Sequence, residues 1–447
     1  MIKNIYEQKS LTKLIFIFGV PSILSLMIEM LTGIVDTAFA GNLPGVGDSA
    51  LSAMALISPV LAIFIALQTL FAMSTGILIA RYLNDTQRLN ESYRTGVIMS
   101  VVTSTGISLL CFFTLPQILT ALGADGEILV MANQYLQIQL LNNIFSSIGY
   151  TLSCCIRAFG FPKAEVKIIT AAVLVDIIFN FIFAFLFKMG LAGLAWGTLV
   201  SEVVCALCCV IFLVRKKLWL CKTPLTVRGF FFSAYELFKL GIAQTAIQVL
   251  GGCTGFVVNS RLLTLGSMSH LAAFSVVQRI YSFALMPVVG LTQGVQNIIS
   301  YFGGNGEHKK IASVSKQTML LCGTYSVIAL LLMIIFGQNI AAIFGGSYEI
   351  LAVAKRILLV VFIGFPFIGV LYTHMMILQV TEHEFASVLL ILSRQVFFLI
   401  PLVYLLPSLV TLSGMPISPI AALFFSMPIA DLLSVIFAIL VKRKVCV

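Results

Sequence analysis

The sequence predicts an all-α polytopic membrane protein, in which twelve transmembrane helices form two six-helix lobes. Apolar types make up 60% of the 447 residues and charged types only 10%, with a mean hydropathy of +1.08. A soluble domain carries about 25% charged residues. At about 20 residues per span plus connections, the chain has room for on the order of twelve to fourteen helices. This composition excludes most classes of soluble enzyme.

The order of apolar runs along the chain gives the predicted elements. The most polar connection lies in the middle, where five basic residues accompany Pro224: Arg215, Lys216, Lys217, Lys222 and Arg228. It separates six runs from six, which predicts an N-terminal lobe over 1–222 and a C-terminal lobe over 223–447. The predicted spans are 14–39, 51–80, 94–114, 129–157, 165–187, 191–214, 234–262, 271–302, 313–336, 350–379, 385–406 and 417–441.

Basic residues gather on alternate loops, which predicts the orientation. Of the 27 Lys and Arg residues, 22 fall on the side of the two termini, with Arg157 and Arg394 counted as loop residues. Because Lys and Arg accumulate in cytoplasmic loops, we expect both termini and the central connection in the cytoplasm, and the chain in the plasma (inner) membrane. The net charge of +10 is then a topology signal, and no nucleic-acid partner is expected.

The two halves resemble each other weakly at an offset near 222 residues, which aligns Gly19 with Gly241. Six spans per half give both repeats the same orientation in the bilayer. Such repeats are related by a pseudo-two-fold axis along the membrane normal and place a site between the halves.

Five acids fall inside predicted spans at least three residues from either end: Glu29, Asp36, Asp176, Glu202 and Asp431. An ionisable group in hydrocarbon costs about 2.5–3.5 kcal/mol on insertion scales, so it usually faces protein or water and marks a pathway. In the first span the polar residues recur at steps of three and four residues, which places them on one helix face. Small polar residues also hold helices together, but two acids favour a lined cavity. The stripe is Ser22, Ser25, Glu29, Thr32 and Asp36.

The fifth and sixth spans repeat this spacing. Asp176 and Asn180 are four residues apart, as are Thr198 and Glu202. We expect these four residues to form a cation-coupling site with Asp36 and Glu29. An acid among apolar walls and like charges can take up and release a proton near neutrality. The same oxygens, at Asp36, Asp176, Asn180 and Thr198, could instead hold Na+; alternatively, Asp176 or Glu202 pairs with Arg394 or Arg279. No cofactor is expected.

The second half carries neutral hydrogen-bonding groups. We expect them to line a substrate site, although Gly-rich faces such as that of Gly251 and Gly255 are commonly close helix contacts. His374 could line the site or be an interior side chain whose hydrogen bonds are satisfied by its own helix or its neighbours. Asp431 could be an ion-pair partner of Lys442 or a second proton-binding site. The expected lining residues are Gln244, Gln248, Asn259, Gln278, Gln293, Asn297, Tyr372 and His374.

Pro21 is a candidate hinge. It removes a backbone hydrogen bond inside the first span, which favours a kink.

The source of energy follows from missing motifs. The sequence lacks a G-x-x-x-x-G-K-[ST] phosphate loop and an H-E-x-x-H zinc motif. No loop is long enough for a nucleotide-binding module. Any pumping must therefore draw on an ion gradient.

Across essentially its whole length the chain resembles the multidrug and toxic compound extrusion (MATE) family, and within it the bacterial members that export cationic drugs. The similarity lies in the order and spacing of several stretches. They are Val35-Asp36-Thr37 with Gly41, the run 50–53, LGADGEILVMANQYL at 122–136, IRAFGFPKA at 156–164, MGLAGLAWGTLVSE at 189–202, GLTQGVQNIISYFGGN at 290–305, SRQVFFLIPLVYLLP at 393–407 and MPIADLLS at 427–434.

The resemblance implies two six-helix lobes, a cation-coupling site in the first lobe, and export by alternating access. The family's essential first-helix aspartate falls on Asp36, its fifth-helix polar positions on Asp176 and Asn180, and its sixth-helix threonine on Thr198. The order Asp then Asn on the fifth helix is reversed relative to common members. Some branches couple sodium through an acid on the seventh helix, where this chain has Gln244 and Gln248. H+ and Na+ both remain open.

The leading hypothesis is therefore a monomeric secondary antiporter that exports amphipathic or cationic organic compounds in exchange for H+ or Na+. A lipid-linked oligosaccharide flippase is the alternative within the same broad class, and it should show broader basic lining for phosphate. From other classes, an intramembrane enzyme would need a nucleophile and base or a metal set, and a nontransporting scaffold would show no vectorial flux.

Overall fold

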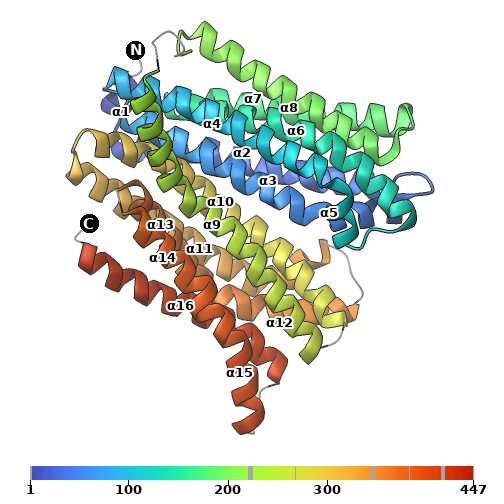
Figure 1. Ribbon diagram of the computed structural model, residues 1–447. Helices are drawn as coiled ribbons and strands as arrows, with labels where there is room; N and C mark the ends of the chain where they lie inside the picture. Colours follow the sequence, from blue (N-terminus) through green and yellow to red (C-terminus); the bar gives the residue numbers. More distant parts are fainter. Residues whose placement is uncertain are drawn as a thin grey trace. The chain divides into compact units, whose positions relative to one another are not determined.

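The computed structural model describes residues 3–219, 225–266, 268–343, 348–381, 383–413 and 418–445, and all regular secondary structure in these ranges is helical (Figure 1). Two elements, η1 and η2, are π-helical. In chain order the helices are α1 (Lys3–Gln8), α2 (Leu11–Gly41), α3 (Gly47–Arg81), α4 (Thr86–Phe113), α5 (Leu115–Ala121), α6 (Gly126–Ala158), α7 (Pro162–Phe181), η1 (Ile182–Leu186), α8 (Gly190–Arg215), α9 (Val227–Leu265), α10 (Met268–Gly304), α11 (His308–Ile343), α12 (Tyr348–Ile363), α13 (Phe365–Val380), α14 (Glu384–Leu392), η2 (Ser393–Leu399), α15 (Ile400–Ser413) and α16 (Pro419–Val445).

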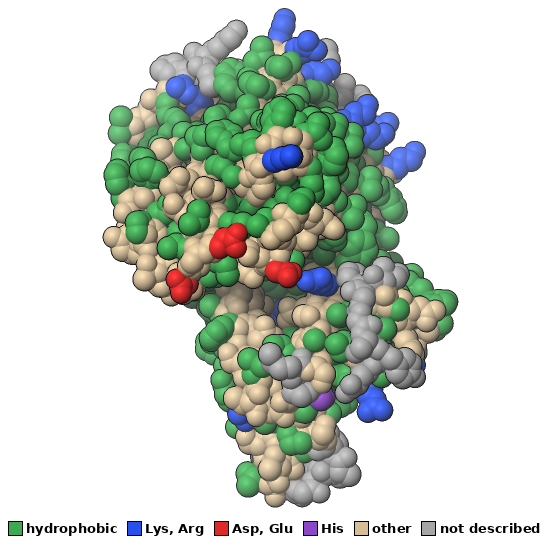
Figure 2. Space-filling view, turned by 90° about the vertical axis from the view of Figure 1, so that its right-hand side faces the viewer, with side chains coloured by type: hydrophobic (Ala, Val, Ile, Leu, Met, Phe, Trp, Pro, Cys, Tyr) green, Lys and Arg blue, Asp and Glu red, His purple; other side chains and the backbone are tan. Residues whose placement is uncertain are grey.

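The described helices supply each of the twelve predicted spans. Ten helical segments of the described residues are long and apolar enough to cross a membrane, and α12 and α13, which are bent by 45° relative to each other, meet the same criteria as a pair. The predicted fourth span is α6, whose Asn and Gln side chains lower its hydropathy. Apolar side chains cover much of the surface in Figure 2, and several of them, such as Phe113 at 74% exposure, face outward. The predicted all-α membrane fold is confirmed.

The chain forms two compact units. The first contains Met1–Thr245 and Ser300–Gly306, and the second contains Ala246–Ile299 and Glu307–Val447. Both α9 and α10 are therefore divided between units, whereas every other described helix lies within one. The sequence boundary predicted between 222 and 223, with Lys222 and Pro224, lies outside the described residues.

In the first unit α6 is the central helix. It packs against α3, α4 and α8, while α7 packs between α2 and α8 (Figure 1). Apolar side chains such as Ile57, Leu136 and Leu194 are buried between these helices. The second unit has a comparable core, in which α13 packs against α11 and α16 and Phe362 and Phe365 are stacked.

The turn between α6 and α7 follows from its sequence. Gly160 has φ +90°, a left-handed conformation that glycine adopts at little cost where a helix ends. Pro162 then begins α7, where its missing N–H needs no helical partner. This short turn brings the end of α6 beside the start of α7 and fixes the relative positions of their charged side chains.

Two assignments from the sequence are wrong. Arg157 and Arg394 do not lie in loops: Arg157 is in the last turn of α6 and is 4% exposed, and Arg394 is in η2. Each forms an ion pair, Arg157 with Glu165 and Arg394 with Asp431. A count of basic residues cannot distinguish a loop charge from a buried charge whose partner lies on another helix.

Candidate functional site

A hydrogen-bonded group of polar residues joins α2 to α7 in the first unit. Asn180 Nδ2 donates to Asp36 Oδ1 at 2.8 Å and to Asp176 Oδ2 at 3.0 Å. Asp176 and Asn180 are buried, at 2% and 0% exposure, and Asp36 is half-buried. One amide group thus bridges two carboxyl groups on helices far apart in the sequence.

The helix α8 provides the rest of this group. Ser201 Oγ lies 3.3 Å from Asp176 Oδ1 and 2.8 Å from the Thr198 carbonyl oxygen. Thr198 is beside Asp176, and its hydroxyl donates to the Leu194 carbonyl oxygen at 3.1 Å. Ser201 was not among the predicted residues, although it lies one turn from Thr198. We call Asp36, Asp176, Asn180, Thr198 and Ser201 the acid cluster.

The other two predicted acids lie outside the acid cluster. Glu202 is half-buried on α8, next to Ser201, and its Oε2 lies beside Gly149 of α6. Glu29 is exposed on α2, two turns before Asp36. Its carboxyl group is within electrostatic range of Glu202, Glu165 and Arg157. Glu29 and Glu202 therefore lie outside the hydrogen-bonded group that Asn180 holds together.

A glycine permits the close approach of α7 and α8 at the acid cluster. A Cβ added to Gly197 would overlap Asn180 Oδ1 and lie 2.6 Å from the Asn180 backbone nitrogen. Gly193, one turn earlier, meets the backbone of Ala184 in the same way. Small residues four apart let helix backbones approach closely. Gly197 is thus what allows Asn180 to lie against α8 while its amide group faces the two carboxyl groups.

We expect Gly197→Ala to displace Asn180. The added methyl group has no space, so α7 and α8 must separate, at a cost of about 1–3 kcal/mol for overpacking. Thermal unfolding of the purified protein and transport by folded protein both check this expectation, and both should fall. The matched control is Gly106→Ala on α4, because apart from the neighbouring backbone of α4 itself no described atom lies within 4 Å of a Cβ placed there. Equal behaviour of the two variants would contradict the assigned role of Gly197.

The helix α7 changes to π geometry directly after Asn180. η1 covers Ile182–Leu186, and η2, which contains Arg394 and Gln395, is its counterpart in the second unit. Isolated π-helical turns cost stability and often occur at functional sites. Here η1 begins two residues after Asn180, and η2 contains Arg394, which pairs with Asp431 of α16.

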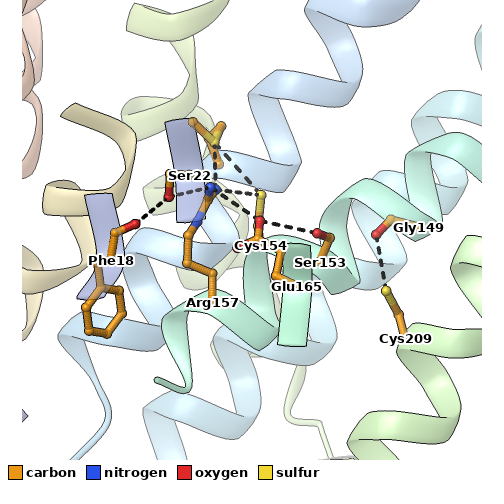
Figure 3. Close-up of polar contacts among 9 residues, drawn as sticks. Phe18, Ser22, Gly149, Ser153, Cys154, Arg157, Glu165 and Cys209 are labelled. Atoms are coloured by element: carbon orange, nitrogen blue, oxygen red, sulfur yellow. Dashed lines mark hydrogen bonds and ion pairs between the residues drawn. The ribbon is translucent and has the colours of Figure 1, made fainter. Parts of the chain in front are cut away.

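A second polar group in the first unit surrounds Arg157 (Figure 3). Its guanidinium group lies 3.3 Å from Glu165 Oε1 of α7 and donates from Nη1 to Ser22 Oγ of α2 at 3.4 Å. Nη2 contacts the sulfur atoms of Cys154 and Met73. Ser22 in turn donates to the Phe18 carbonyl oxygen at 2.9 Å. Arg157 therefore links four helices next to Pro21, and no sequence pattern indicated that this basic residue is internal.

In the second unit a buried ion pair takes the place of an acid cluster. Arg394 Nε lies 2.7 Å from Asp431 Oδ1. The alternative pairing of Arg394 with Asp176 or Glu202 is therefore wrong. The other partner considered for Asp431, Lys442, has a side chain that lies outside the described residues. Asp431 Oδ2 would contact a Cβ at Gly364, the residue at the bend between α12 and α13.

The predicted substrate-lining residues differ in their surroundings. Gln248, Asn259 and Gln278 are exposed, Gln244, Gln293 and Tyr372 are half-buried, and Asn297 and His374 are buried. His374 Nδ1 lies 2.9 Å from the Val370 carbonyl oxygen. In the second unit, Tyr372 lines a small pocket with Ile247, Met375, Ile391, Arg394 and Gln395.

The glycines in the middle of α9 make no close helix contact within the second unit. Apart from the neighbouring backbone of α9 itself, no described atom of the second unit lies within 4 Å of a Cβ placed on Gly251, Gly252 or Gly255. In the part of the chain that the structure describes, no group of three His, Cys, Asp or Glu residues could hold a metal ion. The acid cluster offers two carboxyl groups, an amide and two hydroxyls instead.

A multi-pass helical fold with acids inside its membrane spans is typical of membrane transporters. The MatE family model matches residues 21–182 and 245–405, one match in each half of the chain. The chain belongs to the MatE family.

Relatives of known name agree with this assignment. The chain is 28% identical over 423 residues to the multidrug export protein MepA of Staphylococcus saprophyticus, covering 92% of this chain and 90% of MepA. It is 27% identical over 419 residues to MepA of Staphylococcus aureus, with the same coverage.

Solved structures show the same fold. The Vibrio cholerae MATE transporter VcmN in the bent form has a TM-score of 0.88 and 18% identity, over 97% of this chain and 96% of that one. The outward-facing conformation of a multidrug resistance MATE family transporter has a TM-score of 0.88 and 17% identity, over 98% and 96%.

Proposed function

We propose that this chain is a secondary antiporter of the plasma membrane, with both termini in the cytoplasm. It exports amphipathic or cationic organic compounds in exchange for H+ or Na+ by alternating access. Its sequence relatives carry the name multidrug export protein, which supports small organic compounds as substrates. We propose a monomer that needs no cofactor.

The observation that carries the proposal is the bridging of Asp36 and Asp176 by Asn180. Two carboxyl groups that share one neutral amide repel each other when both are ionised, and this repulsion is strong away from water. Among the described ion pairs none involves Asp36 or Asp176. A proton or Na+ would therefore relieve a charge that forms no ion pair with any of the described basic side chains.

The same geometry suggests how ion binding changes shape. A hydrogen bond from an amide to an ionised carboxylate is about twice as strong as one to a neutral group. Neutralising Asp36 weakens the link from α2 to α7 and favours movement of α2 about Pro21. By linkage, the ion drives export only if its affinity differs between the inward-open and outward-open states.

The chemistry of the cluster is compatible with either ion. Asn180 Oδ1 is buried and has no hydrogen-bond partner among the described residues. An unsatisfied buried oxygen costs about 1–3 kcal/mol, and a sodium ion could use it together with the carboxylate and hydroxyl oxygens of Asp176 and Thr198. A proton would instead reside on Asp36 or Asp176.

The test is efflux from sealed proteoliposomes across a panel of cationic dyes and drugs, first with an imposed pH gradient and then with a sodium gradient. We expect efflux to depend on one of the two gradients. Protein-free vesicles, and vesicles in which the gradient has been collapsed by an ionophore, are the controls. Efflux that is equal with and without both gradients would exclude ion-coupled antiport.

A further inference from the structure

A small pocket in the second unit is lined on one side by polar side chains and on the other by apolar ones. It is partly open and has room for about one particle of the size of a water molecule, which is too small for a drug. Its polar lining residues are Tyr372 of α13 and Arg394 and Gln395 of η2, and its apolar lining residues are Ile247, Met375 and Ile391.

Arg394 brings a positive charge to this pocket. Its Nε lies 2.7 Å from Asp431 Oδ1, and the hydroxyl group of Tyr281 is also beside its guanidinium group. A guanidinium group has several further N–H donors, so these two partners leave donors available. Asp431 is not among the described residues that line the pocket, and its side chain is 5% exposed against 17% for Arg394. The pocket therefore adjoins the positive member of the ion pair and not its counter-ion.

Gln395 and Tyr372 add two neutral donors. Gln395 is 8% exposed, and its Oε1 accepts a hydrogen bond from Thr254 Oγ1 at 2.8 Å. Its Nε2 donates to no other described residue, and the hydroxyl group of the half-buried Tyr372 likewise has no hydrogen-bond partner within the described ranges. Tyr372 is within electrostatic range of Arg394. Both side chains thus have donors to spare where they line the pocket.

This set of donors selects a small anion. A cation is disfavoured by the guanidinium charge. A water molecule needs acceptors for its own protons, and the acceptor oxygen of Gln395 already binds Thr254. A spherical anion needs no acceptor and can take hydrogen bonds from all the donors at once, one of them charged and therefore strong. The room in the pocket limits the anion to about the size of chloride.

We propose that Arg394, Tyr372 and Gln395 bind one chloride-sized monovalent anion in the second unit. The anion links α13 to η2 and so stabilises the packing of this unit. Because Asp431 already offsets part of the charge of Arg394, the binding is weak, with a Kd on the order of 1 mM. Occupancy then follows the chloride concentration around the protein. This site does not depend on the antiport function proposed above.

Thermal unfolding of the purified full-length protein in detergent tests the proposal. Sodium chloride is compared with sodium gluconate at equal ionic strength, because gluconate is too large for the pocket. A ligand that binds only the folded protein raises its stability in proportion to the logarithm of concentration above Kd. We expect chloride and bromide to raise the midpoint with a half-effect in the millimolar range, and gluconate to have no such effect.

Two substitutions remove single donors. Gln395→Glu retains an acceptor for Thr254 but replaces the amide donor with a carboxylate oxygen that repels an anion, so the chloride effect should disappear. Tyr372→Phe removes one hydroxyl group and should raise the chloride concentration needed about tenfold, the usual effect of one hydrogen bond to a charged group. Arg394 is not replaced, because Asp431 would then be buried without its partner.

Matched controls make the same chemical changes elsewhere in the second unit. Gln338→Glu adds a negative charge on α11, where Gln338 accepts a hydrogen bond from Lys355 at 3.2 Å. Tyr404→Phe removes an exposed hydroxyl group from α15. Both variants should keep the chloride dependence of the wild-type protein. If all four variants lose it equally, the effect is general to the second unit and the proposed site is wrong.

Bromide locates the ion directly by its anomalous scattering. In crystals grown in sodium bromide we expect one ion between the Arg394 guanidinium group, the Tyr372 hydroxyl group and Gln395 Nε2, and none there in crystals of Gln395→Glu. Should that variant not fold, Tyr372→Phe should show a weaker peak than the wild-type protein. A pocket that holds no bromide, or bromide that is equally bound when donors are removed and is thus an adventitious ion only, would overturn the proposal.

Discussion

Replacing Asp36 with Asn is expected to abolish gradient-driven efflux without preventing insertion. Asparagine has nearly the same size as aspartate and can still accept a hydrogen bond from Asn180 Nδ2, so the contact between α2 and α7 is retained. What is lost is the carboxylate that binds the coupling ion. We expect efflux in proteoliposomes to fall to the level of protein-free vesicles, at an unchanged yield of folded protein.

The matched control for this variant is Asp48→Asn. Asp48 is an exposed acid in the first turn of α3, and surface substitutions of this kind usually change stability by no more than about 0.5 kcal/mol. It should export normally. Asp36→Asn protein that is folded and exports at the wild-type rate would show that Asp36 is not the coupling group.

Replacing Arg157 with Met is expected to cause the largest loss of stability. Glu165 is 3% exposed, and its Oε2 already lacks a hydrogen-bond partner among the described residues. Removing one partner of a buried ion pair leaves an uncompensated charge and typically costs about 3–5 kcal/mol. Ser22 and α2 would also lose their link to α6. We expect a much lower midpoint in thermal unfolding of the purified protein in detergent.

Two further variants show whether the lost stability comes from the unpaired charge. Arg157→Met combined with Glu165→Gln removes both charges and should recover a large part of the loss, since replacing both members of a buried pair is often nearly neutral. Lys167→Met removes an exposed basic residue from the same helix as Glu165 and should have little effect. A double variant no more stable than Arg157→Met would place the effect in side-chain packing.

Much of the acid cluster could be predicted because helical spacing identifies residues on one face. The stripe on the first span and the pairs at four-residue spacing are enough to indicate Asp36, Asp176, Asn180 and Thr198 from the sequence alone. Spacing does not indicate which faces of different helices meet. Ser201 and Gly197 were therefore missed, because their roles depend on how closely α8 approaches Asn180.

Internal ion pairs were harder to predict for the same reason. Arg157 and Glu165 are only eight residues apart, but the turn at Gly160 is what brings them together. Arg394 and Asp431 are on separate spans, and the sequence offered several partners for each. The division of α9 and α10 between two compact units was also not predicted, because the sequence gives each helix as a single span.

The central claim is that the acid cluster binds the ion that is exchanged for substrate. The most direct measurement is the reverse flux, in which a substrate gradient is imposed on proteoliposomes without an ion gradient, and internal indicators record pH and sodium. We predict that the wild-type protein moves H+ or Na+ in the direction opposite to the substrate, and that Asp36→Asn moves neither ion. Substrate-driven ion flux of equal size in folded Asp36→Asn protein would contradict the claim.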